Sequence, residues 1–171
     1  MRKRLGKAVR EEFERQLRDA LPVFERSAHK PWLRGDRLYE CKMENGLSLF
    51  VQLRRSNYAW KDAFTLCVGW GEDGKFPGGE SVPDGVPQDG TLMFQLPSLW
   101  TTSGMIPWWQ LNTDGPIDSD WDPTGPLIGE SEEELLPKVA PAVSDAIERF
   151  REHGLPYFRS IAAQRGVTTP F

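Results

Sequence analysis

Residues 100–122 carry the side chains best suited to recognition, because large aromatic rings and carboxylates gather there in one turn-rich stretch. Four of the seven tryptophans and four aspartates fall in it: Trp100, Trp108, Trp109, Trp121, Asp114, Asp118, Asp120 and Asp122. Such a group either packs into a core or forms a binding surface. The candidate binding surface is Trp100, Trp108, Trp109, Trp121, Asp118, Asp120 and Asp122. We expect Trp121 to be partly exposed, and at least one of Trp108 and Trp109 to be in the core.

The alternating aspartates of this stretch could be the start of a calcium site. Asp118, Asp120 and Asp122 have the spacing of the first, third and fifth ligands of a calcium-binding loop. The sixth position of such a loop is a sharply turning glycine, but here it is Pro123, whose φ is fixed at a negative value. The twelfth position is Gly129, where a bidentate glutamate is needed. The sequence therefore predicts an acidic turn without a metal, and sugar hydrolysis by paired carboxylates is supported by composition alone.

The remaining chemistry-bearing residues form no catalytic motif. We expect His153 to bond the last carbonyl groups of a helix, and no strained serine or activated cysteine motif accompanies His29. Cys41 and Cys67 match no zinc spacing and are predicted to be free and buried. Residues 71–90 are rich in glycine but interrupted by prolines and acids, so a flexible loop is favoured over a phosphate-binding one. We predict no catalytic set, no metal and no cofactor.

Composition sets the class of protein. A chain of 171 residues with 39% hydrophobic and 27% charged residues is typical of one soluble globular domain. The formal net charge of -4 argues against a nucleic-acid-binding protein, which needs a basic face. Arg2, Lys3 and Arg4 are not followed by an apolar run of signal-peptide length, so we expect a cytoplasmic protein that does not enter a membrane. Residues 168–171 are expected to be a frayed tail.

Two helices are predicted, one at each end of the chain, and Gly154-Leu155-Pro156-Tyr157-Phe158 should turn the chain into a last short helical segment. The first has apolar residues at spacings of three and four, namely Leu5, Val9, Phe13, Leu17, either Ala20 or Leu21, and Phe24. Pro22 should end or kink this helix near Ala20. The second has Ser131 as its N-cap, with Glu134 completing a capping box. Pro137 would be tolerated inside the opening turn of this helix, whereas Pro141 would not. We therefore expect the regular helix to form again around Pro137 and to run to His153, with Gly154 as its stop.

Strands are predicted where apolar and polar residues alternate, at residues 39–43, 47–53, 64–70 and 92–96. The first two should form a hairpin around Asn45-Gly46. A two-residue loop would place the two apolar sets on opposite faces of the sheet. A three-residue loop with Gly46 in the left-handed conformation pairs Cys41 with Leu49 and Tyr39 with Val51, so we predict this register.

The order of these elements resembles the bacterial family called domain of unknown function 4304. The similarity lies in the hairpin-like segment from Leu47 to Trp70, in Trp108-Trp109-Gln110-Leu111, and in the segment from Ser131 to Phe158. The chain departs from the family in the 71–90 insertion and in its two helix prolines. The resemblance implies a fold but no activity or catalytic set, and some similar small proteins look like immunity partners of bacterial toxins.

We therefore expect an α+β domain spanning residues 1–171, with an antiparallel sheet of about four strands covered on one face by the terminal helices. The first functional hypothesis is a non-enzymatic protein-binding domain, such as an immunity or antitoxin-type inhibitor of a basic toxin domain. The alternative is a small-ligand binder or enzyme with a pocket between residues 71–90 and the tryptophan-rich stretch. A third hypothesis, self-association through an open sheet edge, leaves the oligomeric state undecided.

Overall fold

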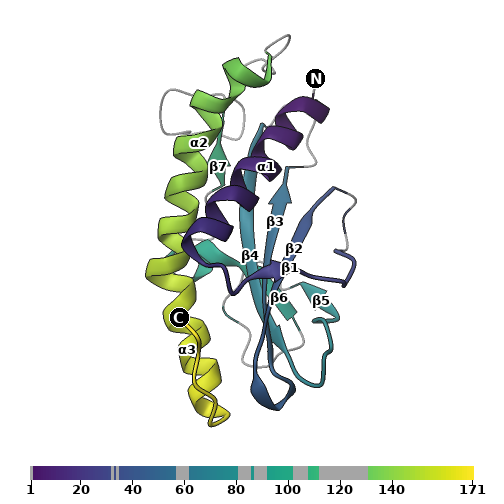
Figure 1. Ribbon diagram of the computed structural model, residues 1–171, viewed down its shortest axis with the longest axis vertical. Coiled ribbons are helices and arrows are strands. Elements are labelled where there is room, and N and C mark those ends of the chain that lie inside the picture. Colours follow the sequence, from purple (N-terminus) through teal and green to yellow (C-terminus); the bar gives the residue numbers. More distant parts are fainter. Residues whose placement is uncertain are drawn as a thin grey trace.

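The computed structural model describes residues 2–31, 33, 35–56, 62–80, 86, 92–101, 108–111 and 131–171. These residues form an α+β fold in which helices cover one face of a mainly antiparallel sheet (Figure 1). The predicted fold class is confirmed. Among the described residues, no helix has both the length and the apolar character needed to span a membrane.

Helix α1 (Arg2–Ala20) has the predicted amphipathic pattern. Its buried apolar residues Leu5, Val9, Phe13 and Leu17 are each four residues apart, and Ala8 lies three residues after Leu5. The helix ends at Ala20 as predicted, because Pro22 disfavours helical geometry in the residue before it. The chain then enters the two-residue strand β1 (Glu25–Arg26).

The sheet has the strand order β1-β2-β3-β4-β6-β5, and β7 pairs with β4 beside this path. Its longer strands are the four predicted from the alternation: β2 (Arg37–Lys42), β3 (Ser48–Arg55), β4 (Ala63–Gly71) and β6 (Leu92–Gln95). The two-residue strands β5 (Gly79–Glu80) and β7 (Trp109–Gln110) were not predicted. In the described part of the chain the edge strands β1 and β5 are short, so they offer few unpaired backbone groups to a second chain.

The hairpin between β2 and β3 has the predicted register. Cys41 lies opposite Leu49 and Tyr39 lies opposite Val51. The connecting turn η1 (Glu44–Gly46) has Gly46 in the left-handed region with a φ of 79°, as predicted, and Asn45 is also left-handed with a φ of 61°. This register matters because it turns the apolar residues of both strands toward the helices.

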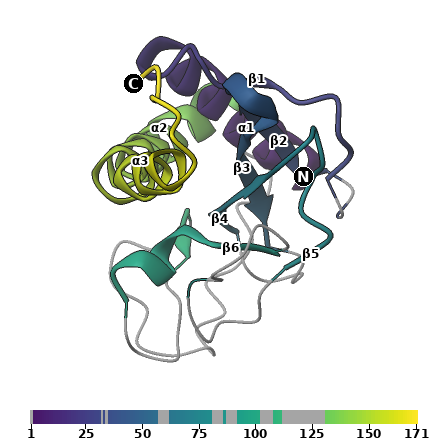
Figure 2. The same ribbon diagram turned by 90° about the horizontal axis from the view of Figure 1, so that it is seen from below.

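Helix α2 (Glu132–Arg149) begins at the predicted capping box, in which Ser131 accepts from the backbone of Glu134. The expectation that regular helix starts only around Pro137 is wrong, because Pro137 and Pro141 both lie inside the helix. Both prolines are exposed, so water can solvate the carbonyl groups that their missing amides leave unpaired. Figure 2 shows α2 and α1 on the same side of the strands β3 and β4.

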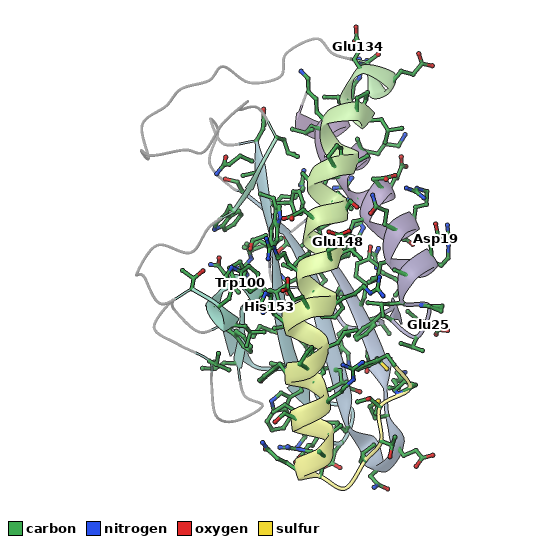
Figure 3. All side chains as sticks on the ribbon, turned by 90° about the vertical axis from the view of Figure 1, so that its left-hand side faces the viewer. Asp19, Glu25, Trp100, Glu134, Glu148 and His153 are labelled. Atoms are coloured by element: carbon green, nitrogen blue, oxygen red, sulfur yellow. The ribbon has the colours of Figure 1, made fainter. Side chains whose placement is uncertain are left out.

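The predicted helix stop at Gly154 is also wrong. A π-helical turn, η3 (Phe150–Gly154), joins α2 directly to α3 (Leu155–Gln164), and Figure 3 shows one continuous rod from Glu134 past His153. Gly154 has ordinary helical angles, with φ −71° and ψ −44°. A glycine is needed there for space, since a Cβ atom would lie 2.3 Å from Cδ2 of Phe150.

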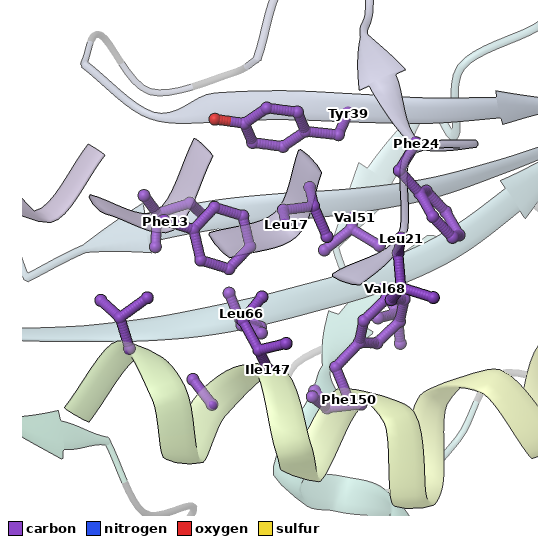
Figure 4. Close-up of a cluster of buried hydrophobic side chains, with 14 of the residues drawn as sticks. Phe13, Leu17, Leu21, Phe24, Tyr39, Val51, Leu66, Val68, Ile147 and Phe150 are labelled. Atoms are coloured by element: carbon purple, nitrogen blue, oxygen red, sulfur yellow. The ribbon is translucent and has the colours of Figure 1, made fainter. Parts of the chain in front are cut away.

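The main core lies between the helices and the sheet. Phe13 and Leu17 of α1 meet Ile147 and Phe150 of the C-terminal rod above Val51, Leu66 and Val68 of the sheet (Figure 4). The ring of Phe24 packs against Phe150 and Phe158, with centroid distances of 5.5 Å and 6.0 Å. The C-terminal residues, which were expected to fray, end in Phe171, whose ring stacks on Phe24 at 5.8 Å.

The opposite face of the sheet is also withdrawn from solvent, whereas the predicted sheet was covered on one face only. A second cluster of buried residues, with Phe76 packed against it, lies there: Leu38, Phe50, Cys67 and Met93. Every residue of β4 is buried, and so is every residue of β3 except Arg55. Polar side chains on this face must therefore find their partners within the protein.

We predict that Gly154→Ala lowers the free energy of unfolding by about 1–3 kcal/mol, because the added methyl group overpacks the turn against Phe150 and Leu96. A loss of stability would point to this steric conflict, because alanine within a helix is normally more stable than glycine by about 1 kcal/mol. Urea denaturation measures the effect. Ser160→Ala, on the exposed side of α3, is the control and should change stability little. A Gly154→Ala protein as stable as the wild type would show that the turn has room for a side chain.

Candidate functional site

The surface proposed from the sequence falls only partly within the described residues. Trp100, Trp108 and Trp109 are described, and all three are half-buried. Trp121 and the aspartates Asp118, Asp120 and Asp122 lie outside the described residues. The expected exposure of Trp121 and the acidic turn around it therefore stay predictions.

Trp109 is fixed by the pairing of β7 with β4, which sets it opposite Phe64. The two rings stack with a centroid distance of 5.6 Å and an interplanar angle of 14°. The indole Nε1 of Trp109 donates a hydrogen bond to Oδ2 of Asp145 on α2, at 2.7 Å. Trp109 thus joins the edge of the main core while part of its ring remains exposed.

Trp100 follows the short helix η2 (Leu96–Leu99), and its ring lies against His153, with a centroid distance of 4.5 Å (Figure 3). The imidazole Nε2 of His153 is in turn 3.4 Å from Oε2 of Glu152. The expectation that His153 bonds the last carbonyl groups of a helix is wrong, because the helical rod continues through this residue into α3. Its place in the π-helical turn brings it to Trp100 instead.

Ion pairs along the C-terminal rod connect the two tryptophans. Arg149 Nε lies 3.8 Å from Asp145 Oδ1, and Arg149 Nη1 lies 3.1 Å from Glu152 Oε2. A continuous chain of contacts, which we call the Trp–helix strip, therefore consists of Trp109, Asp145, Arg149, Glu152, His153 and Trp100. Its carboxylates and guanidinium are exposed, and its rings are half-buried.

A second group of polar residues lies on the face of the sheet turned away from the helices. The strand register places Gln52 beside Cys67, Cys67 beside Gln95, and Arg54 beside Thr65. We call this group the polar sheet face and define it as Asp36, Gln52, Arg54, Thr65, Cys67 and Gln95. All but Gln95 are buried, and none of these residues was predicted to belong to a site.

Asp36 is the charged centre of the polar sheet face. Its Oδ2 accepts a hydrogen bond from Nε2 of Gln52 at 2.8 Å and lies 3.6 Å from Nε of Arg54. Its Oδ1 accepts from the backbone amide of Arg55 at 3.4 Å. Burial raises the pKa of Asp36 above the ordinary value of a carboxyl group, because these hydrogen bonds and cations replace only part of the lost hydration.

A second carboxylate on the same face, that of Glu40, is better compensated. It accepts hydrogen bonds from the hydroxyl of Ser48 at 2.7 Å and from the hydroxyl of Ser27 at 2.9 Å. Both of its oxygens therefore have a donor. This arrangement explains how a buried glutamate is tolerated within a strand.

The histidine and thiol groups of the described region are packed among other side chains. The ring of His29 stacks on Phe76 at 5.8 Å and meets the edge of Phe50 at 5.7 Å. Cys41 and Cys67 are buried and are not joined in a disulfide, as predicted, and burial raises the pKa of the Cys41 thiol to about 11. Within the described ranges, no three His, Cys, Asp or Glu side chains gather in a group that could hold a metal ion.

A sequence signal for the covered second face was present. The alternation of β2, β3, β4 and β6 leaves one set of positions on the face away from the helices, and four of these positions are Leu38, Phe50, Cys67 and Met93. A solvent-exposed face of a sheet carries few apolar residues of this size. The polar residues between them could therefore have been recognised as buried.

We predict that Asp36→Asn gains stability relative to the wild type as the pH rises. The folded-state pKa of Asp36 is raised, so its stabilising contribution is full below its ordinary pKa of 3.8 and is lost as the pH rises through the folded value. Asparagine still offers an acceptor to Gln52 and carries no charge. Urea denaturation between about pH 4 and about pH 7 measures the difference, with exposed Glu148→Gln as the control. A wild-type-to-variant difference that does not change with pH would contradict the raised pKa.

Comparison with known proteins identifies no relative: no protein-family model matches the chain, and no curated protein or solved structure is significantly similar to it. The resemblance to domain of unknown function 4304 therefore stays an expectation. The function has to be inferred from the geometry of the two sites described above.

Proposed function

We propose that this protein is a non-enzymatic binding protein that recognises a basic protein partner through the Trp–helix strip. The observation that carries the proposal is that Trp100 and Trp109, both half-buried, are joined by ion-paired residues of one helical rod. The strip is thus held in place before any partner binds. A preorganised surface loses less side-chain entropy on association.

The residue types of the strip are those that dominate protein interfaces. Tryptophan and arginine are enriched among the residues whose truncation costs most binding energy. Two carboxylates, Asp145 and Glu152, accompany one guanidinium, that of Arg149, so the exposed charge of the strip favours a cationic partner. The formal net charge of -4 on the whole chain acts in the same direction by steering a basic protein toward it.

The described nucleophiles and bases support binding rather than catalysis. Cys41 has a raised thiol pKa, whereas a reactive cysteine needs a lowered one. His29 and His153 each pack against an aromatic ring. A strong binder without a reaction of its own is what an immunity-type inhibitor of a basic bacterial toxin domain has to be, and we propose that class of partner. The alternative, a pocket between residues 71–90 and the tryptophan-rich stretch, falls on segments of which only residues 71–80, 86, 100–101 and 108–111 are described.

Affinity purification of the tagged protein from its own cells should recover a basic partner, and calorimetry on the purified pair then tests the strip. We predict that Trp100→Ala raises the dissociation constant by about tenfold or more, because a half-buried ring at an interface loses its contact area. The double variant Asp145→Asn, Glu152→Gln should slow association and weaken its salt dependence, since it removes two steering charges while each new amide keeps an acceptor.

The matched control is the double variant Glu11→Gln, Glu133→Gln, which makes the same change in net charge at exposed positions away from the two tryptophans. It should leave the dissociation constant within about twofold of the wild type. Recovery of no partner would contradict the proposal. So would a partner whose affinity is equally affected by the strip variant and by the control.

A further inference from the structure

Four arginine side chains gather between α1 and the sheet edge formed by β1 and β2, and we call them the arginine cluster. Arg10 belongs to α1, Arg26 to β1, Arg37 to β2 and Arg55 to the end of β3. Arg26 is exposed, and the other three are half-buried. A ligand can therefore reach the cluster from the solvent without entering the core.

The pairing of the strands puts Arg26 and Arg37 on the sheet face that α1 covers. Arg26 lies opposite Tyr39 of β2, and Arg37, two residues before Tyr39, points to the same side of the sheet. The Tyr39 ring packs against Phe13 of α1 with a centroid distance of 5.5 Å. The guanidinium carbon of Arg26 lies 5.8 Å from the centre of the same Tyr39 ring. This ring therefore forms the base of the cluster.

Arg55 reaches the same place between two glycines, Gly6 of α1 and Gly35 before β2. A Cβ atom on either glycine would overlap the guanidinium group of Arg55. Gly35 has a left-handed φ of 102°, and Gly6 lies inside a helix, where glycine costs about 1 kcal/mol relative to alanine. The backbone thus leaves room for this guanidinium at the expense of helix stability.

Arg10 lies one turn after Gly6 on α1. A helical side chain extends back over the turn that precedes its own Cα atom, so Arg10 extends toward the point where Arg55 meets Gly6. Burial and the charge of Arg55 lower the pKa of Arg10, and burial with the charges of Arg26 and Arg10 lowers the pKa of Arg37. The four guanidinium groups are therefore close enough to repel one another.

The carboxylates beside the arginine cluster already have partners. Oε2 of Glu14 lies 3.9 Å from Nη1 of Arg26, and Oε1 of Glu11 lies 3.7 Å from Nζ of Lys7. Both of these glutamates are exposed, so each pair is weak. They leave most of the positive charge of the cluster without compensation.

The guanidinium groups of Arg10 and Arg55 form no ion pair or hydrogen bond with any residue that the structure describes. Nε of Arg55 is in addition withdrawn from solvent. A cation that loses hydration without gaining a partner destabilises the folded chain. A bound anion would remove this cost and the repulsion between the arginines at the same time.

The geometry of the group indicates which anion fits. The planar fork of a guanidinium matches two oxygens of a phosphate group, and several forks can share one phosphate because its oxygens point in different directions. A carboxylate offers only two oxygens and one charge. The formal net charge of -4 disfavours a nucleic-acid backbone, which requires a wider basic surface than four arginines.

We propose that the arginine cluster binds the phosphate group of a small molecule, whose oxygens accept hydrogen bonds from Arg10, Arg37 and Arg55. Arg26 adds a fourth positive charge at the exposed side. Inorganic phosphate and phosphate monoesters share this chemistry, so they are separate arms of the test. The cluster has no residue in common with the Trp–helix strip, and this inference does not depend on the proposed function.

The test is a thermal-shift measurement followed by calorimetry on the full chain at constant ionic strength. One arm uses inorganic phosphate, and the other uses glucose 6-phosphate and adenosine monophosphate. Both arms should raise the melting temperature of the wild type until the site is saturated, whereas sodium chloride of the same ionic strength should not. Equal affinity in the two arms identifies free phosphate as the ligand, and tighter binding of a monoester identifies an organic phosphate.

Arg10→Gln should raise the dissociation constant for phosphate by about tenfold, because it removes a charge-assisted hydrogen bond. It should not lower the melting temperature in the absence of phosphate, since the lowered pKa of Arg10 means that its charge is unfavourable in the folded chain. Arg37→Gln is the second variant and should weaken binding to a similar degree.

Arg18→Gln is the matched control, because it makes the same change in charge at an exposed position about two turns further along α1. It should leave the dissociation constant within about twofold of the wild type. The pair Arg10→Gln and Arg18→Gln thus separates a local site from a general effect of net charge.

Three results would overturn the inference. In the first, phosphate and the monoesters raise the melting temperature no more than sodium chloride does. In the second, the dissociation constant is the same for the wild type, Arg10→Gln and Arg37→Gln. In the third, a single-stranded oligonucleotide binds more tightly than every monoester and Arg10→Gln weakens its binding, which would make the cluster a nucleic-acid surface.

Discussion

The burial of both faces of β3 and β4 is the constraint on which the rest of the structure depends. Successive side chains of a strand point to opposite faces, so a strand buried along its whole length has no side that water can reach. An antiparallel sheet with one wet face leaves its polar side chains hydrated. Here every polar side chain of the central strands needs a partner within the protein, and the two faces meet that need in different ways.

The face toward the helices has few polar side chains, because apolar residues of α1 and the C-terminal rod fill it. The other face combines an apolar cluster around Phe50 with two carboxylates, Asp36 and Glu40. Two serine hydroxyls compensate Glu40, whereas the raised pKa of Asp36 shows that its compensation is incomplete. Gln52, which donates to Asp36, and Thr65 each have a buried oxygen without a hydrogen-bond partner. The polar sheet face therefore leaves part of its buried hydrogen-bonding capacity unused.

The alternation predicted the strands and the hairpin register well, because a three-residue loop turns Tyr39 and Cys41 to the same face as Val51 and a two-residue loop does not. It predicted the C-terminal rod poorly, because proline and glycine rules describe isolated helices. Pro137 and Pro141 are four residues apart and share an exposed face, while the buried side supplies the packing that holds the helix together. The polar sheet face was missed because alternation reveals which residues share a face but not whether that face is covered.

The continuity of the rod links the core to the proposed binding surface. In the π-helical turn, Phe150 fills the main core while His153, three residues later, lies against Trp100. The glycine at position 154 allows the Phe150 ring to approach the turn closely, and so allows both contacts at once. π-Helical turns are costly to form and occur frequently at functional sites. The π-helical turn, which replaces the helix end predicted at Gly154, therefore sets the position of one end of the Trp–helix strip. A change in core packing at Phe150 would also move His153 and Trp100.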